Sequence, residues 1–453
     1  MPTLRLVVII KYEQHLRSWL YAGILSNLNS QFNLLVLAPE SLLGKINTFD
    51  SSLIVEPIKQ QSHPLIEKAI GHILYLSKFR NPSFRYRYLG LFFPKPCGPL
   101  TYRYKRRLIQ GIYNLPYVAL GIIASISSGI AKLLIAGLLR IIPSIKVPES
   151  DCYLLVDGET NLLSLQLARS IRKMGVFHIN YPDNWDNLSS KMFYLDAPDL
   201  LLTWGNQTKR HASEIHKIPD HLIELIGSSR ILNQNQLDMQ IQTSENSRVN
   251  SSDKQLNILY VGFGIDTEPQ MVIALNQKLR IELGPHGFKL SYRLHPTQII
   301  DQFDYVQLHE VGIEFVNERE DNRVSWPISN VKFYKELLEP DLIFLAPSTL
   351  VLETALLDKR IVLDMRPSKS NEYIDHKKGF TKRTHFDEFL EIKALAQLTD
   401  LEELSTEYIN SVTKFSDTDG VRVLNDVIFN NELDFVERLS NIVTNVFQNL
   451  KGD

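Results

Sequence analysis

The chain has 453 residues, 44% hydrophobic and 22% charged, a balance typical of folded proteins that excludes a disordered or low-complexity chain. The formal net charge is −2, so no overall basic field points to nucleic acid. Two cysteines, Cys97 and Cys152, exclude a disulfide framework and a four-thiolate zinc site, and they favour a reducing cytoplasm.

The first half alternates short apolar runs with amphipathic stretches, starting at the N-terminus. The apolar run before Lys11 is too short for a signal peptide and predicts a buried strand instead. The expected strands are Leu4–Ile10, Phe32–Leu37, Cys152–Val156, Val176–Asn180 and Leu200–Trp204, and the expected helices are Leu16–Leu28, Leu162–Met174 and Thr208–His216. Such alternation predicts a parallel, doubly wound sheet.

A long apolar stretch interrupts this pattern between Gly111 and Pro143, and a basic cluster at 103–107 precedes it. A membrane-spanning helix needs about 20 apolar residues, but Pro116 and Lys132 interrupt the run. Three interpretations stay open: helices on a membrane surface or acceptor side, buried helices, and a true span. A membrane surface is thus a candidate partner for residues 103–143.

Polar, aromatic-poor composition between residues 233 and 254 predicts a linker, after which the alternation restarts. Strands are expected at Asn257–Val261, Lys289–Leu294, Leu342–Leu345 and Arg360–Leu363, and helices at Glu268–Leu283, Thr349–Leu357 and Leu433–Leu450. We therefore expect an α/β protein with two doubly wound domains. Residues 1–232 form the first, with an apolar and basic insertion at about 100–145; residues 255–430 form the second, and a C-terminal helix at 431–453 packs back on the first.

Polar residues at the carboxyl ends of the predicted strands are the candidate site residues, because open α/β sheets bind ligands there. In the first half, His15 and Asp157 are candidate bases, and Glu159 follows closely. A loop after Asn180 carries further candidates for reading hydroxyl groups: Asp183, Asn184, Trp185, Asp186, Asn187 and Lys191. Trp185 is a candidate stacking platform for a sugar. The alternatives are helix capping by the acids and a rigid structural loop.

In the second half, the strand ends favour phosphate chemistry. Arg293 offers a planar cationic fork, and His295 stands beside Pro296 at the end of one strand. Ser348 and Thr349 begin a helix after another strand, where free N–H groups attract anions, with Glu353 one turn inside. Gly262 and Gly264 allow close approach of the backbone to a ligand. The alternatives are an ordinary helix cap, a surface arginine, a packed histidine and a tight turn.

Several motifs are missing from the sequence. It has no GxxxxGK[ST], HExxH, CxxC or GxSxG pattern, which argues against P-loop phosphoryl transfer, zinc sites and serine hydrolysis. The couplet Asp417-Thr418-Asp419 precedes Gly420 without an apolar strand before it, so a solvated turn is favoured over a cation site. We expect no metal and no cofactor.

This organisation resembles the GT-B glycosyltransferases, which have two Rossmann-like domains, an interdomain cleft and a closing helix. His295-Pro296 and Ser348-Thr349 resemble elements of bacterial surface-polysaccharide and capsule enzymes: sialyltransferases, Kdo transferases and CDP-glycerol glycerophosphotransferases. Asp157-Gly158 matches the sialyltransferase acidic element only in part, since its first acid is missing. The glutamate that retaining members carry seven residues after the position of Glu353 is replaced by Arg360, which disfavours that branch.

The resemblance implies that the first domain binds the acceptor and the second binds the nucleotide donor. Asp157 would deprotonate the acceptor, His295 with Ser348 and Thr349 would hold or protonate the phosphate, and Glu353 would bind the ribose. The implied reaction is a metal-independent, inverting transfer of a sugar from a nucleotide-activated donor to a carbohydrate or lipid-linked acceptor. It implies a cytoplasmic enzyme, peripheral on the inner face of the membrane in one interpretation. A CDP-glycerol-type transferase, a nucleotide-sugar epimerase and a non-catalytic polysaccharide-assembly protein remain alternatives.

Overall fold

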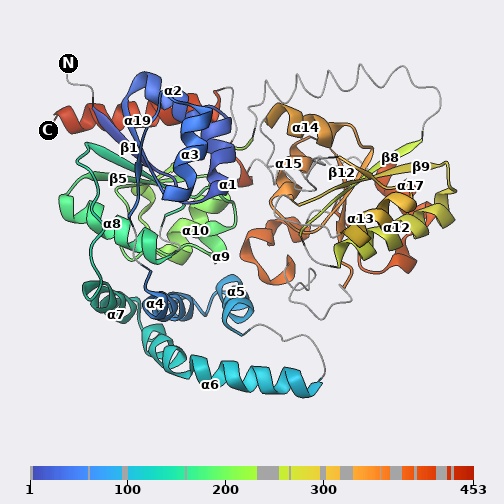
Figure 1. Ribbon diagram of the computed structural model, residues 1–453, viewed down its shortest axis with the longest axis horizontal. Helices are drawn as coiled ribbons and strands as arrows, with labels where there is room; N and C mark the ends of the chain where they lie inside the picture. Colours follow the sequence, from blue (N-terminus) through green and yellow to red (C-terminus); the bar gives the residue numbers. More distant parts are fainter. Residues whose placement is uncertain are drawn as a thin grey trace. The chain divides into compact units, whose positions relative to one another are not determined.

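The computed structural model divides the chain into two compact units (Figure 1). Unit 1 comprises Met1–Asn233, Arg383–His385 and Asp426–Asp453, and unit 2 comprises Gln234–Lys382 and Phe386–Asn425. The residues that the structure describes are 4–59, 62–93, 100–158, 161–231, 255–264, 267–295, 302–316, 330–357, 359–367, 380–391, 395–414, 426–429 and 433–452. The predicted linker at 233–254 and the Asp417–Asp419 couplet lie outside them.

Unit 1 is built on a seven-stranded parallel sheet in the order β3-β2-β1-β4-β5-β6-β7. Its strands are β1 (Arg5–Ile9), β2 (Asn33–Ala38), β3 (Ile54–Pro57), β4 (Cys152–Val156), β5 (Phe177–Tyr181), β6 (Leu200–Thr203) and β7 (Ile223–Leu225). Between them lie α1 (Glu13–Leu16), a π-helical turn (Arg17–Tyr21), α2 (Ile24–Gln31), α3 (Glu40–Phe49), α4 (Pro64–Ser77), α5 (Pro82–Phe92), α6 (Leu100–Ser125), α7 (Ser128–Arg140), α8 (Leu162–Met174), α9 (Asn187–Ser190), α10 (Asn206–His216) and a 3₁₀ turn (Asp220–Leu222). The central strands are buried almost completely, which explains their unbroken apolar runs.

The strand order of unit 1 reverses between β1 and β4. Val8 pairs with Leu154, so the carboxyl ends of these strands are neighbours. The turn from β1 into α1 and the turn after β4 therefore meet at the topological switch point, where doubly wound sheets bind ligands. His15 and Asp157 lie on these two turns.

The crossover from β3 to β4 contains a helical insertion, α4–α7. In Figure 1 it lies beyond the sheet of unit 1, with α6 as its longest helix. The apolar stretch between Gly111 and Pro143 forms parts of two helices, α6 and α7. Ser127 caps the start of α7 by accepting a hydrogen bond from Ile130 N–H (3.1 Å). Capping satisfies one of the free donors of α7.

Unit 2 repeats the same topology with six parallel strands in the order β10-β9-β8-β11-β12-β13. Its elements are β8 (Leu256–Val261), α12 (Glu268–Leu283), β9 (Phe288–Arg293), α13 (Gln302–Glu310), β10 (Glu314–Phe315), α14 (Asn330–Leu338), β11 (Leu342–Leu345), α15 (Leu350–Leu356), β12 (Arg360–Asp364), 3₁₀ turns (Glu388–Glu391 and Leu401–Glu403), β13 (Ala396–Leu398) and α17 (Thr406–Lys414). The switch point of this sheet lies between β8 and β11. Two doubly wound parallel sheets confirm the α/β class with two Rossmann-like domains that was expected from the sequence.

The last helix, α19 (Phe435–Gly452), belongs to unit 1. Phe435 packs against Trp19 and Tyr181, with ring centroids 6.3 and 5.2 Å apart, and Arg438 Nε donates to the Ile226 carbonyl (2.7 Å). Its apolar face therefore completes the core of unit 1.

One predicted element was wrong. The expected helix Leu16–Leu28 is broken into α1, a π-helical turn and α2, because Gly23 adopts a left-handed conformation (φ +78°) between them. Glycine pays no steric cost there. The break shortens the helix that follows β1.

Candidate functional site

The switch point of unit 1 holds a buried histidine–aspartate pair. His15 Nε2 lies 3.0 Å from Asp157 Oδ2, and the two side chains are 0% and 4% exposed. The residues are far apart in the sequence, and only the parallel pairing of β1 with β4 brings them together. The structure thus unites the two candidate bases of the first half in one pair.

A constrained backbone and several hydrogen bonds hold Asp157 in place. Its backbone is left-handed (φ +55°), which is uncommon for a residue other than glycine and marks a constrained turn. Its Oδ1 accepts the N–H of Asp183 (2.7 Å) and a side-chain hydrogen bond from Asn187. Burial would raise the pKa of this carboxyl, but hydrogen bonding and charge from His15, with Lys11 and Asp183 N–H, hold the pKa below its usual value.

Lys11 fixes the backbone of the turn that carries Asp157. Its buried ammonium donates to the carbonyls of Asp157 and Gly158 (2.8 Å to the latter) and to Ser164 Oγ (2.7 Å). These acceptors use the three donors of the ammonium group. The loop is therefore rigid up to Gly158. Glu159, the next predicted site residue, lies outside the described residues.

One ring nitrogen of His15 has no partner among the described residues. Its Nδ1 is buried and makes no hydrogen bond with them. Because an ionised carboxylate only accepts, the proton of the neutral ring is on Nε2 and Nδ1 carries a lone pair. An imidazole oriented by a carboxylate in this way can take a proton from a hydroxyl group.

The loop from Asp183 to Lys191 is mainly structural. Asp183 is fully buried, pairs with Arg230 (2.9 Å) and accepts from Trp19 Nε1 (3.2 Å). The Asn184 carbonyl accepts from Asn187 N–H (3.1 Å), and its side chain is half-buried. The carboxylate of Asp183 is therefore engaged within the protein, whereas a ligand contact of Asn184 stays a prediction.

The structure contradicts a stacking role for Trp185. The side chain is 1% exposed, its Nε1 donates to Gln207 (2.5 Å), and its ring packs edge-on against His385 (4.8 Å). A buried indole offers no face to a sugar ring. The stacking prediction was wrong because the ring is buried, and the polar residues around Trp185 in the sequence did not indicate this burial.

Asp186 and Lys191 form a second, partly accessible ion pair (2.7 Å), with side chains 14% and 28% exposed. Burial lowers the pKa of Lys191 most, and Asp186 opposes that shift. Nearby, His385 Nδ1 lies 2.8 Å from Ser189 Oγ. Of the predicted loop residues, this pair and Asn184 are half-buried, and the others are buried.

In unit 2, the three predicted phosphate loops follow neighbouring strands. Val261 at the end of β8 pairs with Arg293 on β9 and with Leu345 on β11. The turn at Gly262, the exit at His295 and the helix start at Ser348 therefore share one edge of the sheet. This is the arrangement that the phosphate prediction requires.

A carboxylate already occupies the glycine turn. Glu268, 1% exposed, accepts the N–H groups of Phe263 (2.6 Å) and Gly264 (3.2 Å), and Gly262 N–H donates to Arg293 O (2.8 Å). A Cβ on Gly262 would lie 2.8 Å from Glu268 Oε2, and one on Gly264 would lie 3.1 Å from His295 Nδ1. These glycines thus permit close packing within the protein, and their contact with a phosphate stays a prediction.

Arg293 is also engaged inside unit 2. Its side chain is 5% exposed, Nε donates to Glu336 (3.1 Å), and the guanidinium lies 4.8 Å from the centre of the Phe333 ring. One edge of the guanidinium is therefore engaged inside unit 2, and its contact with a phosphate stays a prediction. His295 beside it is half-buried, and burial lowers its pKa with help from the charge of Arg293.

The start of α15 fits the prediction better. Ser348 and Thr349 are half-buried, and their carbonyls accept from Val351 and Leu352 N–H (3.1 and 3.0 Å). Glu353 in the first turn of α15 is 4% exposed. A carboxylate at this position can accept hydrogen bonds from a ligand hydroxyl.

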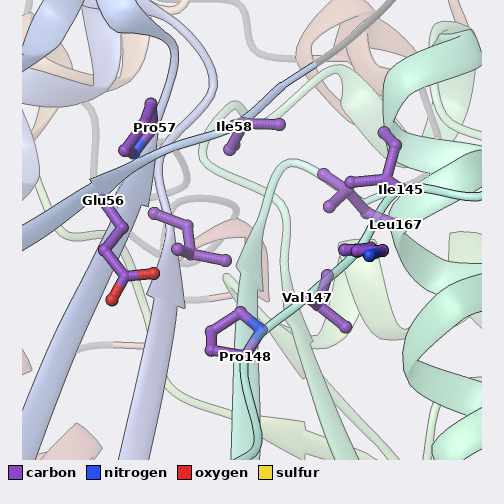
Figure 2. A pocket seen from close by; sticks show the side chains of 9 residues that line it. Glu56, Pro57, Ile58, Ile145, Val147, Pro148 and Leu167 are labelled. Atoms are coloured by element: carbon purple, nitrogen blue, oxygen red, sulfur yellow. The ribbon is translucent and has the colours of Figure 1, made fainter.

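The described residues form no metal-binding cluster, and a cavity of unit 1 includes none of the predicted site residues. Within the described ranges, no three His, Cys, Asp or Glu side chains are placed to hold a metal ion. A cavity of about 230 Å³ lies between the ends of β2 and β3 and the segment Ile145–Pro148 (Figure 2). It is lined mainly by apolar side chains, includes none of the predicted site residues, and is smaller than typical ligand pockets.

Three residues of the two sites were missed from the sequence: Lys11, Glu268 and His385. Lys11 directly follows β1, a position that could have signalled a role at the strand end. Glu268 begins a helix, where an acid is expected. His385 carried no local signal, because its contacts come from α9 and α10.

No protein-family model matches the sequence, and no curated protein matches it either. A solved glycosyltransferase from Rickettsia africae is 10% identical, with 99% of each chain covered and a TM-score of 0.46. CalG4, the calicheamicin glycosyltransferase, is 9% identical over 94% of each chain, with a TM-score of 0.48. The UDP-GlcNAc 2-epimerase of Methanocaldococcus jannaschii, solved with UDP-GlcNAc and UDP, is 12% identical over 97% of this chain and 99% of that chain, with a TM-score of 0.45. At such identities and TM-scores, these likenesses assign no activity to this chain.

Proposed function

We propose that this protein is a glycosyltransferase of the GT-B type that moves a sugar from a nucleotide-activated donor to a hydroxyl group of a surface-polysaccharide or glycolipid acceptor. The observation that carries the proposal is the buried His15–Asp157 pair at the switch point of unit 1, with His15 Nδ1 unpartnered. A hydroxyl nucleophile needs a base of this kind.

The proposed reaction is a single displacement. The acceptor hydroxyl gives its proton to His15 Nδ1 while its oxygen bonds to the anomeric carbon of the donor sugar. The bond from that carbon to the nucleotide phosphate breaks, and its electron pair leaves with the phosphate. Attack opposite the leaving group inverts the anomeric centre, and Asp157 stabilises the imidazolium that forms.

In this proposal Asp157 is a positioning residue rather than the base. Its carboxylate oxygens accept from His15, Asp183 and Asn187, and its pKa is below the usual value, so it is a weak proton acceptor. His15 is fully buried, so the acceptor reaches Nδ1 only after a neighbouring side chain moves. Tyr12, half-buried and edge-on to His15 (5.2 Å between ring centroids), is a candidate for this movement.

We assign the donor to unit 2, around Ser348, Thr349, Glu353 and His295. The adjacency of β8, β9 and β11 and the position of Glu353 in the first turn of α15 support this assignment. Glu353 would accept hydrogen bonds from ribose hydroxyls, and His295 would donate to the departing phosphate. The reaction requires no divalent cation, so a chelator should leave its rate unchanged.

The decisive test compares His15→Gln with His221→Gln, an exposed histidine of the same unit. With UDP-, GDP-, CDP- and dTDP-sugars as donors, His15→Gln should lower the transfer rate about 10²–10⁴-fold. Thermal shifts by the free nucleotides should not change, because the donor lies on unit 2. Asp157→Asn should lower kcat with unchanged KM for the donor. A His15→Gln enzyme with the wild-type rate would overturn the proposal.

The same panel separates the alternatives. A new sugar isomer formed from the donor alone would identify an epimerase. Transfer from CDP-glycerol, with no reaction of any nucleotide sugar, would identify a polyol-phosphate transferase. No thermal shift with any nucleotide would indicate a non-catalytic assembly protein.

A further inference from the structure

The insertion of unit 1 carries an extreme charge bias. No Asp or Glu occurs between Glu67 and Glu149, whereas this stretch holds thirteen Lys and Arg residues. The whole chain has a net charge of −2, so the remaining residues are strongly acidic overall. A patch of one sign attracts a partner of the opposite sign, and this patch favours an anionic one.

Helix α6 buries only one narrow stripe. Asn114, Gly121 and Ala124 are buried on the side that packs against α4, and a Cβ on Gly121 would meet the Leu76 side chain and the His72 carbonyl. These positions recur at helical spacing, so they form one face. The opposite face has no helix against it in the described part of unit 1.

That opposite face is apolar. Leu108, Ile112, Leu115 and Ile122 follow helical spacing and are 60%, 64%, 66% and 57% exposed. Leu133 of α7 and Ile126 and Ile141 at the helix ends are also exposed, at 75%, 74% and 70%. A row of large exposed apolar side chains marks an interaction surface.

Basic residues adjoin this row at the start of α6. Lys105, Arg106 and Arg107 are exposed, and the described structure gives Lys105 and Arg107 no ion pair. Stretch Tyr104–Ser125 is long and apolar enough to cross a membrane, yet only 17% of it is buried. A buried core helix is therefore excluded among the three interpretations. Basic side chains next to an apolar helix face are typical of helices that lie in a membrane interface.

We propose that the exposed face of α6 and α7 docks onto an anionic membrane surface, and, resting on the proposed function, that the acceptor is a lipid-linked carbohydrate. The helices lie in the interface plane: apolar side chains enter the acyl boundary, and Lys105, Arg106 and Arg107 meet lipid phosphates. An anionic bilayer matches both the apolar row and the uncompensated charge.

The docking surface is connected to the candidate site by a short path of contacts within unit 1. Helix α4 packs on α6, α5 follows α4, and α5 packs on α9. Asn187, the first residue of α9, hydrogen-bonds Asp157. A membrane-bound α6 therefore holds the acceptor side of the enzyme near the lipid phase.

The test is vesicle flotation of the full chain without nucleotide. Wild-type protein should float with vesicles of phosphatidylcholine and phosphatidylglycerol, and float poorly with phosphatidylcholine alone. Neutralisation by Lys105→Gln, Arg106→Gln and Arg107→Gln together should lower the partition coefficient about 100-fold. Leu108→Ser with Ile112→Ser should lower it more than about tenfold.

Matched controls keep these effects specific. Lys173→Gln with Lys335→Gln removes exposed charge elsewhere, and Ile281→Ser removes a 77% exposed apolar side chain on unit 2; both should float like wild type. His15→Gln should also float like wild type, so failure of docking and failure of the proposed reaction are distinguishable.

Three outcomes would overturn the docking proposal. One is no flotation with anionic vesicles. Another is bound protein that resists alkaline extraction, which identifies a spanning helix. The last is lipid-free self-association abolished by Leu108→Ser and Ile112→Ser, which identifies a second copy as the occupant. If flotation holds but transfer to water-soluble acceptors equals transfer to lipid-linked ones, the lipid-linked acceptor is wrong.

Discussion

His15 and Asp157 show what a single residue's position reveals. Both follow strand ends, and the sequence marked each as a candidate base. Their pairing at 3.0 Å depends on the β1–β4 contact. In the reaction that we propose, Asp157 orients the ring and His15 accepts the proton. Arg293 and Trp185 were also predicted to contact a ligand, and the structure shows both side chains in contact with other residues of the protein.

A substitution of Glu268 tests the structure at the scale of a single residue. Glu268→Gln keeps the shape of the side chain, but its amide N–H₂ must face one of the N–H donors of Phe263 and Gly264. Losing one buried hydrogen bond in this way should reduce the free energy of unfolding by about 1–3 kcal/mol, measured by urea denaturation. Glu310→Gln, on an exposed part of α13, is the control and should change little. Unchanged stability of Glu268→Gln would contradict the assigned role of this carboxylate.

At the scale of elements, local patterns identified the central strands well, because a strand buried on both faces is a continuous apolar run. Edge strands such as β3, β10 and β13 were missed, since they are short and partly exposed. The sequence showed that the α4–α7 insertion is apolar and basic. It did not show that the apolar side chains are exposed, because this depends on α6 packing against α4 through one narrow stripe.

The close contact of α6 with α4 is open to a direct test. Gly121→Ala would place a Cβ 2.2 Å from the Leu76 side chain and 3.0 Å from the His72 carbonyl. Overpacking should therefore destabilise the insertion by about 1–3 kcal/mol, observed as faster hydrogen exchange in α4 and α6. Gly137→Ala in α7 has nothing within 4 Å and should be neutral or stabilising by up to about 1 kcal/mol. Equal effects of both substitutions would contradict the packing at Gly121.

At the scale of the whole molecule, the buried histidines gather in unit 1. Burial lowers the pKa of His178 and His216 to about 3, and of His72 and His211 to about 4. In the unfolded chain these imidazoles have the ordinary histidine pKa of 6.5. The unfolded state therefore binds more protons between these values, and stability is lost as the pH falls from 6.5 toward 4.

We expect the free energy of unfolding of unit 1 to decrease over this pH range. Trp19, Trp185 and Trp204 are buried in unit 1, so tryptophan fluorescence in urea reports its unfolding. His178→Gln should reduce the slope by about 1.4 kcal/mol per pH unit, the value for one proton. His221→Gln, which changes an exposed histidine, should leave the slope unchanged. A wild-type slope in His178→Gln would contradict the prediction.

The sequence by itself determined the α/β class, the central strands, the closing helix and the strand ends where polar residues gather, because burial periodicity and strand–helix alternation are local properties. Tertiary structure decided which of those polar groups are free. It satisfied Asp183 and Arg293 with partners distant in sequence, and it left His15 Nδ1 without a hydrogen-bond partner in the described chain. The physical reason is that a buried polar group must find its partner in space, and distance in space depends on the strand order rather than on the spacing of residues along the chain.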